Sequence, residues 1–278
     1  MRVGVISRTD SEAAFPIARR VLEHLHNNGV EHIVETETAM ALDMRDQSVD
    51  LTEMEVNFMI SVGGDGTMLR TAMGLNPPET PILGINLGRR GFLCEVAPEE
   101  TEASIDKALN GDYQLETCLK LSSRSVGMVE DFPDALNEVL VSSSLPSKMI
   151  IAKISVDGED LTEIQADGII VSTPTGSTAY NVSAGGSILA PGVDAIIVTA
   201  VCPYSYFRSI TLPATAHISI ELLKPKADAL AIIDGKVYTA LKPFTTVEVE
   251  ASGHKTRFIR FKHFYGRLRN RISHLQSQ

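Results

Sequence analysis

A glycine-rich stretch with one carboxylate inside it, SVGGDGTMLR at residues 61–70, is the most unusual chemical feature of the sequence. Glycines behind a strand usually let backbone N–H groups approach a phosphate closely. Asp65 stands among these glycines, and its charge would repel that phosphate. Neither the Gly-Lys-Ser/Thr of the common phosphate loop nor the G-x-G-x-x-G dinucleotide fingerprint is present. The stretch therefore indicates a ligand that is held beside a negative charge.

Two further polar segments lie downstream. The segment ADGIIVSTPTGSTAYNVSAGG, residues 166–186, carries six Ser and Thr hydroxyls together with that of Tyr180. These groups suit ribose hydroxyls and amides, although a turn before a capped helix produces the same pattern. Asn137 and Glu138 open an apolar run, and an amide beside a carboxylate can bind both hydroxyls of a ribose. For that pair alone, a turn at the entry to a strand is the favoured interpretation.

The order of the expected elements places the glycine cluster at the end of a strand. Buried strands are expected at residues 2–7, 31–35, 56–62 and 81–86, and helices at 11–28, 67–74 and 98–110. Alternation of strands and helices indicates a parallel sheet with right-handed crossovers. Open sheets of this kind bind ligands at the carboxyl ends of their strands. From about residue 115 the apolar runs become short and alternating, and Asp-Gly pairs at 157–158 and 234–235 predict hairpins in a second, β-rich domain.

Composition narrows the class of protein. The chain has 278 residues, of which 44% are apolar and 22% charged, and a net charge of −10. This balance is ordinary for a globular protein, and the negative charge disfavours nucleic acid as a partner. No apolar run is long enough for a membrane span or a signal peptide, so we expect a cytoplasmic protein with no membrane partner. The three cysteines are too widely spaced for a disulfide framework or a zinc site.

The C-terminal segment, residues 255–271, carries seven Lys and Arg residues, no acid, and interleaved aromatic residues. One interpretation is a surface that binds nucleic acid or phosphate. The other is a strand and a helix that pack through their aromatic side chains. We favour packing, because a single basic segment in an acidic chain more often pairs with acids.

Five motifs, taken together and in order, resemble the NAD kinases, which phosphorylate NAD to NADP. They are GGDGTMLRTA, NLGRRGFL, LNEV, ADGIIVSTPTGSTAYNVSAGG and IIDGK. Diacylglycerol and sphingoid-base kinases share GGDGT, so the Gly-Ser-Thr-Ala-Tyr block with Asn-Glu upstream narrows the choice. The resemblance covers nearly the whole chain. It implies a Rossmann-like N-terminal α/β domain (residues 1–115 with a returning tail, 255–278), a β-rich, β-sandwich-like C-terminal domain (116–254), and a homodimer or homotetramer.

The resemblance also implies a role for individual residues. Asp65 would accept the proton of the adenosine 2′-hydroxyl of NAD, although it could instead bind Mg²⁺. The donor phosphates, of ATP or polyphosphate, would lie at Gly63, Gly64, Gly66 and Thr67. NAD would contact Asp65, Gly66, Arg70, Asn137, Glu138, Lys148, Asp167, Thr178, Ala179, Tyr180, Ser183 and Lys236. Mg²⁺ or another divalent metal is expected as cofactor, with ligands that the sequence does not identify. Cys118 stands where many members of the family have an arginine.

Two alternatives remain at this stage. A lipid or sphingoid-base kinase of the GGDGT group would need an apolar channel, where this chain has the hydroxyl-rich segment 172–183. A non-enzymatic NAD(P)-binding sensor would retain residues 178–183 and would not need Asp65.

Overall fold

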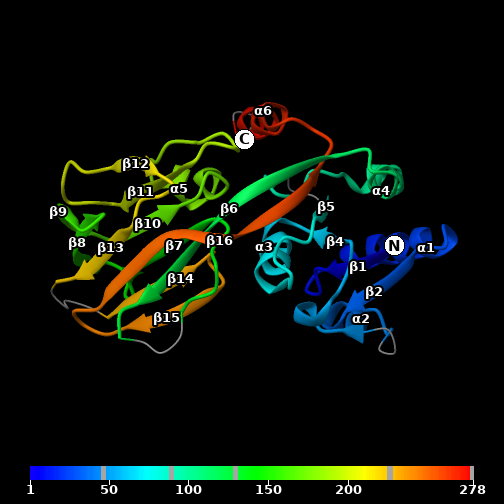
Figure 1. Cartoon of the computed structure of the whole chain (residues 1–278), viewed down its shortest axis with the longest axis horizontal. Coiled ribbons are helices and arrows are strands. Elements are labelled where there is room, and N and C mark those ends of the chain that lie inside the picture. Colours follow the sequence, from blue (N-terminus) through cyan, green and yellow to red (C-terminus); the bar gives the residue numbers. More distant parts are fainter. Residues whose placement is uncertain (45–47, 88–90, 128–130, 224–227, 276–278) are drawn as a thin grey trace. The chain divides into compact units, whose positions relative to one another are not determined.

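The computed structural model describes residues 1–44, 48–87, 91–127, 131–223 and 228–275, with side chains as far as Arg269. The chain divides into two compact units, residues 1–117 with 256–278 and residues 118–255. Strands β6 (Gln114–Ser125) and β16 (Thr246–Arg260) each begin in one unit and end in the other (Figure 1). Among the described residues, no helix is long and apolar enough to cross a membrane.

The first unit is an α/β unit around a parallel sheet, as predicted (Figure 1). Its sheet order is β3-β2-β1-β4-β5, followed by the end of β16, where Phe258 pairs with Ile82. The strands are β1 (Arg2–Ser7), β2 (Glu31–Glu35), β3 (Ser48–Val49), β4 (Phe58–Gly63) and β5 (Ile82–Asn86). The helices are α1 (Ala14–Asn27), α2 (Thr36–Ala41), α3 (Asp65–Gly74), α4 (Thr101–Asn110) and α6 (Phe264–Leu275). Short 3-10 turns cover Leu51–Glu53 and Pro98–Glu100.

The core of this unit follows from its apolar runs. Every residue of β4 and β5 is buried, which is typical of a parallel sheet covered on both faces. Helix α1 buries Ala14, Ala18, Val21, Leu22 and Leu25, a stripe at helical spacing, and the last four of these pack in the same cluster as residues of β1 and β4. Asn86, at the end of β5, also pairs with a residue ten positions further along the chain: its N–H donates to Val96 O at 2.8 Å. This sheet places residues 63–67 and 92–96 at the ends of neighbouring strands.

The second unit is built from antiparallel sheets, which confirms the β-rich prediction. One sheet has the order β12-β11-β10-β7-β14-β15, and the other strands follow the order β16-β13-β8-β9. The strands are β7 (Glu138–Ser143), β8 (Ile150–Val156), β9 (Glu159–Ala166), β10 (Gly168–Ser172), β11 (Ala195–Val201), β12 (Ser209–Pro213), β13 (Ile218–Leu222), β14 (Ala229–Ile233) and β15 (Val237–Leu241). A 3-10 turn at Gly176–Thr178 and the short helix α5 (Tyr180–Ser183) follow β10.

Both Asp-Gly pairs form the predicted hairpin turns. Asp157 and Gly158 join β8 to β9 with φ of 52° and 83°, and Asp234 and Gly235 join β14 to β15 with φ of 49° and 62°. Two consecutive residues with positive φ match the twist of the flanking strands, and the pair Asp-Gly tolerates that conformation.

Candidate active site

The glycine cluster lies between β4 and α3, at the carboxyl end of a central strand. Gly63 is the last residue of β4, Gly64 precedes α3, and Asp65 is its first residue. Thr67 lies in the first turn with its side chain nearly buried, and Gly66 is exposed. The free N–H groups at a helix N-terminus attract anions, and the helix dipole adds to this attraction. The residues predicted for the donor phosphates therefore lie together at such an end.

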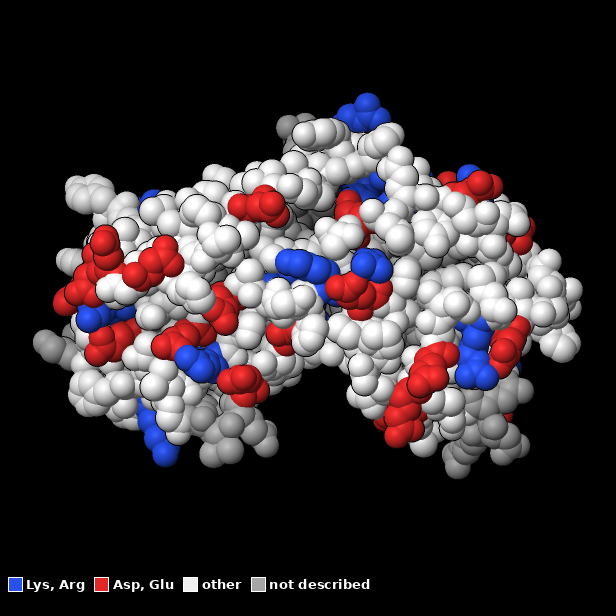
Figure 2. Space-filling view, viewed as in Figure 1, with Lys and Arg blue, Asp and Glu red and all other residues white. Residues whose placement is uncertain are grey.

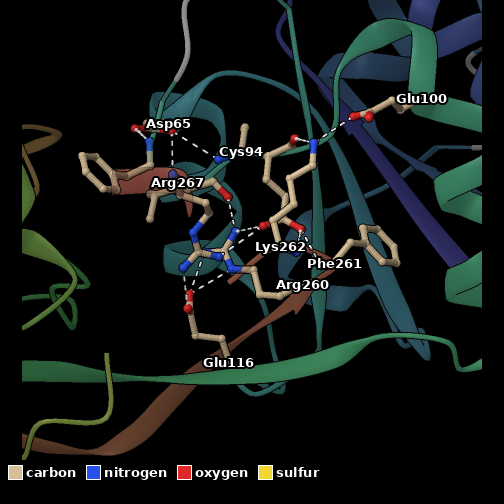
Figure 3. Close-up of polar contacts among 11 residues, drawn as sticks. Asp65, Cys94, Glu100, Glu116, Arg260, Phe261, Lys262 and Arg267 are labelled. Atoms are coloured by element: carbon tan, nitrogen blue, oxygen red, sulfur yellow. Dashed lines mark hydrogen bonds and ion pairs between the residues drawn. The ribbon is translucent and has the colours of Figure 1, made fainter. Parts of the chain in front are cut away.

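Asp65 is held by backbone N–H groups of residues 92–94, which come directly after Gly91 of the motif NLGRRGFL (Figure 3). Its Oδ2 accepts the N–H of Phe92 at 2.8 Å, and its Oδ1 accepts those of Leu93 and Cys94 at 3.0 and 3.3 Å. Gly91 lies so close that a Cβ built there would be 1.9 Å from Oδ1. Each carboxylate oxygen can accept two hydrogen bonds, so the contacts made by the described residues leave one accepting position, on Oδ2. Gly88, Arg89 and Arg90 of the same loop lie outside the described residues.

Arg70 contacts acidic groups of its own unit. Its guanidinium pairs with Glu37, lies 3.5 Å from the buried Glu35, and donates to Ser7 O at 3.1 Å. Glu35 also accepts the N–H groups of residues 37 and 38, and so caps α2. Arg70 is thus part of the attachment of α2 to the sheet, with about a third of its side chain exposed.

In the second unit, Asp234 fixes the backbone on which Asn137 and Glu138 stand. Its Oδ2 accepts the N–H of Leu136 at 2.8 Å, and its Oδ1 accepts those of Asn137 and Glu138 at 2.8 and 3.0 Å. Gly176 packs against the other side, where a Cβ would be 2.0 Å from Asn137 O. The structure therefore brings the motifs LNEV, GSTAY and IIDGK together. The sequence predicts a turn at Asp234 and places it in the motif IIDGK, but it does not indicate this anchoring role.

Glu138 is buried with an oxygen that lacks a partner. Its Oε2 has no hydrogen-bond partner among the described residues. Burial, and then the nearby charge of Asp234, raises the pKa of Glu138 to about 8. Burial likewise lowers the pKa of Lys120, while the charges of Asp134 and Asp234 oppose that shift. A buried acceptor without a partner is unfavourable, so this position is suited to a ligand that supplies a donor.

The hydroxyls of the hydroxyl-rich segment stabilise the turn of that segment and attach it to residues 136 and 137. The hydroxyls of Ser172, Thr173, Ser177 and Thr178 donate to backbone carbonyls of the same unit, at 2.6 to 3.4 Å. Their protons are therefore engaged, while their oxygens can still accept hydrogen bonds. The turn-and-helix interpretation accounts for most of this pattern. Ala179 is partly exposed, and Tyr180 and Ser183 are exposed.

Three residues predicted to contact NAD line one open hollow of the second unit. Lys148, Asp167 and Tyr180 surround a space of about 300 Å³. The ring of Tyr180 is 42% exposed. Lys236 follows the hairpin turn at Asp234 and is exposed as well.

Neither the cysteines nor the acidic residues form a metal site within the described ranges. No group of three or more His, Cys, Asp or Glu residues there could hold a metal ion. Cys94 and Cys118 are buried and free, and Cys202 is exposed and free. Burial, followed by the charge of Asp65, raises the pKa of the Cys94 thiol, which makes it a poor nucleophile.

Two family models match the chain, the ATP-NAD kinase N-terminal domain over residues 3–113 and the ATP-NAD kinase C-terminal domain over residues 136–261. The chain belongs to the NAD kinase family. An NAD kinase from Methanothermobacter thermautotrophicus is 38% identical over 275 residues, which cover 98% of this chain and 96% of the relative. An NAD kinase from Thermococcus gammatolerans is 39% identical over 266 residues, 95% of each chain.

Solved structures agree with this assignment. A crystal structure of an NAD kinase from Archaeoglobus fulgidus in complex with ATP has a TM-score of 0.78 and 28% identity, and the match covers all of both chains. Yeast NADH kinase complexed with NADH shares the fold, with a TM-score of 0.85, 24% identity, and coverage of 94% and 84%. The family, the fold class and the NAD kinase activity predicted from the motifs are confirmed, whereas the roles of single residues stay predictions. The match of both family domains disfavours a lipid or sphingoid-base kinase.

Proposed function

We propose that this NAD kinase transfers the terminal phosphoryl group of ATP to the adenosine 2′-hydroxyl of NAD, with Asp65 as proton acceptor. The observation that carries the proposal is a carboxylate fixed by three backbone N–H groups, whose Oδ2 accepts only one hydrogen bond from the described residues. A hydroxyl is a weak nucleophile until its proton is accepted, and an oriented carboxylate within hydrogen-bond reach can do this.

The phosphoryl transfer exchanges one P–O bond for another. The 2′-oxygen forms a bond to the terminal phosphorus while the bond from that phosphorus to the bridging oxygen breaks. ADP leaves, and the hydroxyl proton passes to Asp65. We place the donor phosphates at Gly63, Gly64, Gly66 and Thr67, because the N-terminus of α3 offers backbone N–H groups there. Phosphoryl transfer depends mainly on positioning and charge neutralisation, which such a site provides.

We place NAD on the residues predicted from the sequence. The support for Glu138 is its buried oxygen without a partner, for which a ribose hydroxyl would be a donor. Asn137 stands on the same fixed backbone, and its amide can accept or donate. Thr178, Ala179, Tyr180 and Ser183 would line the dinucleotide, with Lys148, Asp167 and Lys236 near them in the same unit. Gly66 and Arg70 are also proposed contacts of NAD.

A divalent metal does not fit a site made by the protein alone, since the described residues include no cluster of ligands for it. Mg²⁺ is commonly bound through substrate phosphates and only one or two carboxylates. We therefore propose that Mg²⁺ enters as part of the nucleotide substrate. Asp65 as a metal ligand remains the alternative to Asp65 as base.

We further propose that the two compact units are the two domains expected from the sequence, that the chain forms homodimers or homotetramers, and that it works in the cytoplasm. The tail, proposed as a packing element, has four basic side chains paired with acids of its own unit: Arg257 with Glu79, Arg260 with Glu116, Lys262 with Glu100 and Arg267 with Glu95. Figure 2 shows Lys and Arg interspersed with Asp and Glu on the face drawn. Both observations argue against a nucleic-acid surface.

The proposal is tested by incubating the protein with NAD, Mg²⁺ and either ATP or polyphosphate, and measuring NADP. We expect NADP with ATP. Formation of NADP with polyphosphate only would contradict ATP as the phosphoryl donor. Binding of NAD or NADP without product from either donor would favour a non-enzymatic NAD(P)-binding sensor.

A further inference from the structure

The amides that orient Asp65 belong to a segment that is itself held by the C-terminal tail. Arg260, the last residue of β16, donates from Nη1 to the carbonyl oxygen of Leu93 at 2.7 Å. Glu95 accepts the N–H groups of Phe261 and Lys262 at 2.5 and 3.3 Å. Figure 3 shows these contacts side by side with those of Asp65. The tail therefore fixes the middle and the end of the segment 92–95.

The tail makes this attachment through a buried cluster of four charges, defined here as Glu95, Glu116, Arg260 and Arg267. Arg260 donates to Glu116 from Nε at 2.9 Å, and its Nη2 lies 2.8 Å from the same carboxylate oxygen. Arg267 bridges Glu95 at 3.2 Å and Glu116 at 2.5 Å. Their side chains are only 3% to 17% exposed.

The four charges cancel. Although burial alone would raise the pKa of Glu116, the charges of Arg260 and Arg267 hold it below the ordinary value. A buried cluster of this kind fixes geometry more than it adds stability, because desolvation offsets much of the attraction between its charges.

We propose that Arg260 is a positioning residue for phosphoryl transfer: it holds the Leu93 carbonyl, and thereby orients the N–H groups of Leu93 and Cys94 on either side of that carbonyl, which fix the Asp65 carboxylate. The inference rests on the proposed function, since it gives Arg260 a role only through Asp65. It extends that function to a residue more than 190 positions away in sequence, in a tail that the motifs did not connect with chemistry.

The geometry requires an arginine. One guanidinium donates to Leu93 O from Nη1 and to Glu116 from Nε, and brings Nη2 to 2.8 Å from Glu116, because its N–H groups are arranged in a rigid fork. A lysine keeps the positive charge that Glu95 and Glu116 need, but its single nitrogen cannot keep all three contacts. Arg260→Lys should therefore leave the protein folded while it loosens the segment 92–95.

The test compares steady-state kinetics of Arg260→Lys with those of Arg257→Lys. Arg257 lies on the same strand and pairs with Glu79 at the surface, so it is a matched control. We expect kcat of Arg260→Lys to fall by about 10- to 100-fold, a loss typical of small misplacement of a catalytic group, with KM for NAD and ATP nearly unchanged. A kcat within about threefold of that of the control would overturn the proposal.

A double-mutant cycle separates action through Asp65 from a general structural effect. If Arg260 acts through Asp65, adding Arg260→Lys to Asp65→Asn should change kcat by no more than about twofold. A full multiplicative loss in that background would show that Arg260 acts elsewhere. Wild-type turnover of Asp65→Asn alone would instead overturn the proposed function, and the positioning role with it.

A second variant keeps the test decisive if Arg260→Lys does not fold. Glu95→Gln retains an acceptor for the N–H of Phe261 but removes the charge that Arg267 pairs with, so Arg260 and Arg267 are left to share Glu116 and the hold of Arg260 on Leu93 weakens. We expect the same loss in kcat without a change in KM, and the same lack of further effect in Asp65→Asn. Unchanged kcat in folded Glu95→Gln would contradict the proposal.

Discussion

Replacing Glu138 by glutamine should make the protein more stable and bind NAD more weakly. Glu138 is buried, its Oε2 has no partner in the described part of the chain, and its pKa is raised from 4.5 to about 8. Between these two pH values the unfolded chain has lost the proton of this carboxyl while the folded chain keeps it. Stability of the wild type therefore falls as pH rises through this window.

The size of the effect follows from the two pKa values. The difference between 4.5 and about 8 corresponds to at most about 5 kcal/mol of stability lost by pH 8. Glutamine does not titrate, so Glu138→Gln avoids this loss. The gap in Tm between variant and wild type should grow from pH 5 to pH 8 and reach the order of 10 °C.

The assay is thermal unfolding of both proteins without nucleotide, from pH 5 to pH 8, together with calorimetric titration of NAD. We expect Kd for NAD to rise by roughly tenfold or more in Glu138→Gln, because a ribose hydroxyl that donates to Glu138 favours its ionised form with two accepting oxygens, whereas the amide cannot ionise and offers one. A Tm difference that stays constant across the pH range would refute the reasoning about burial. Unchanged affinity for NAD would remove Glu138 from the proposed site.

Three further substitutions test close approaches and exposed contacts. Gly91→Ala places a methyl group against the Asp65 carboxylate, so kcat should fall at least about 10-fold while NAD affinity stays the same; equal turnover would show that the contact is not rigid. Gly176→Ala meets the backbone of Asn137 and should cost about 1–3 kcal/mol in denaturant unfolding, which an unchanged midpoint would contradict. Tyr180→Ala should raise Kd for NAD roughly threefold to tenfold without lowering Tm, since the ring is 42% exposed; unaltered Kd would argue against its place in the site.

Much of the fold was predictable because the sequence marks it locally. Apolar runs and glycines delimit β1, β4 and β5, and the Asp-Gly pairs identify both hairpins. Helix α2 was missed, because it has only six residues and its N-terminus is capped by the side chain of Glu35. No apolar periodicity develops over such a short helix.

The candidate site was predictable in its motifs and not in its hydrogen bonds. Asp234 reads as a turn residue, yet its carboxylate anchors the backbone N–H of Asn137, nearly a hundred positions away. The sequence likewise counts the hydroxyls of residues 172–178 but cannot say that Ser172 and Thr173 donate to the carbonyls of residues 137 and 136, and Ser177 to a carbonyl of its own loop. Arg260 was seen only as one basic residue of the tail. Partners of this kind depend on the tertiary structure, which local patterns do not encode.

The most direct test of the account is the turnover of Asp65→Asn, measured as NADP formed from NAD and ATP with Mg²⁺. Asparagine retains one side-chain oxygen, which can serve the N–H groups of Leu93 and Cys94 but not also that of Phe92, and it is a far weaker proton acceptor than a carboxylate. We predict a folded protein with unchanged Kd for NAD and a kcat lower by at least about 10²-fold. A kcat close to that of the wild type would contradict the central claim that Asp65 takes the proton of the 2′-hydroxyl.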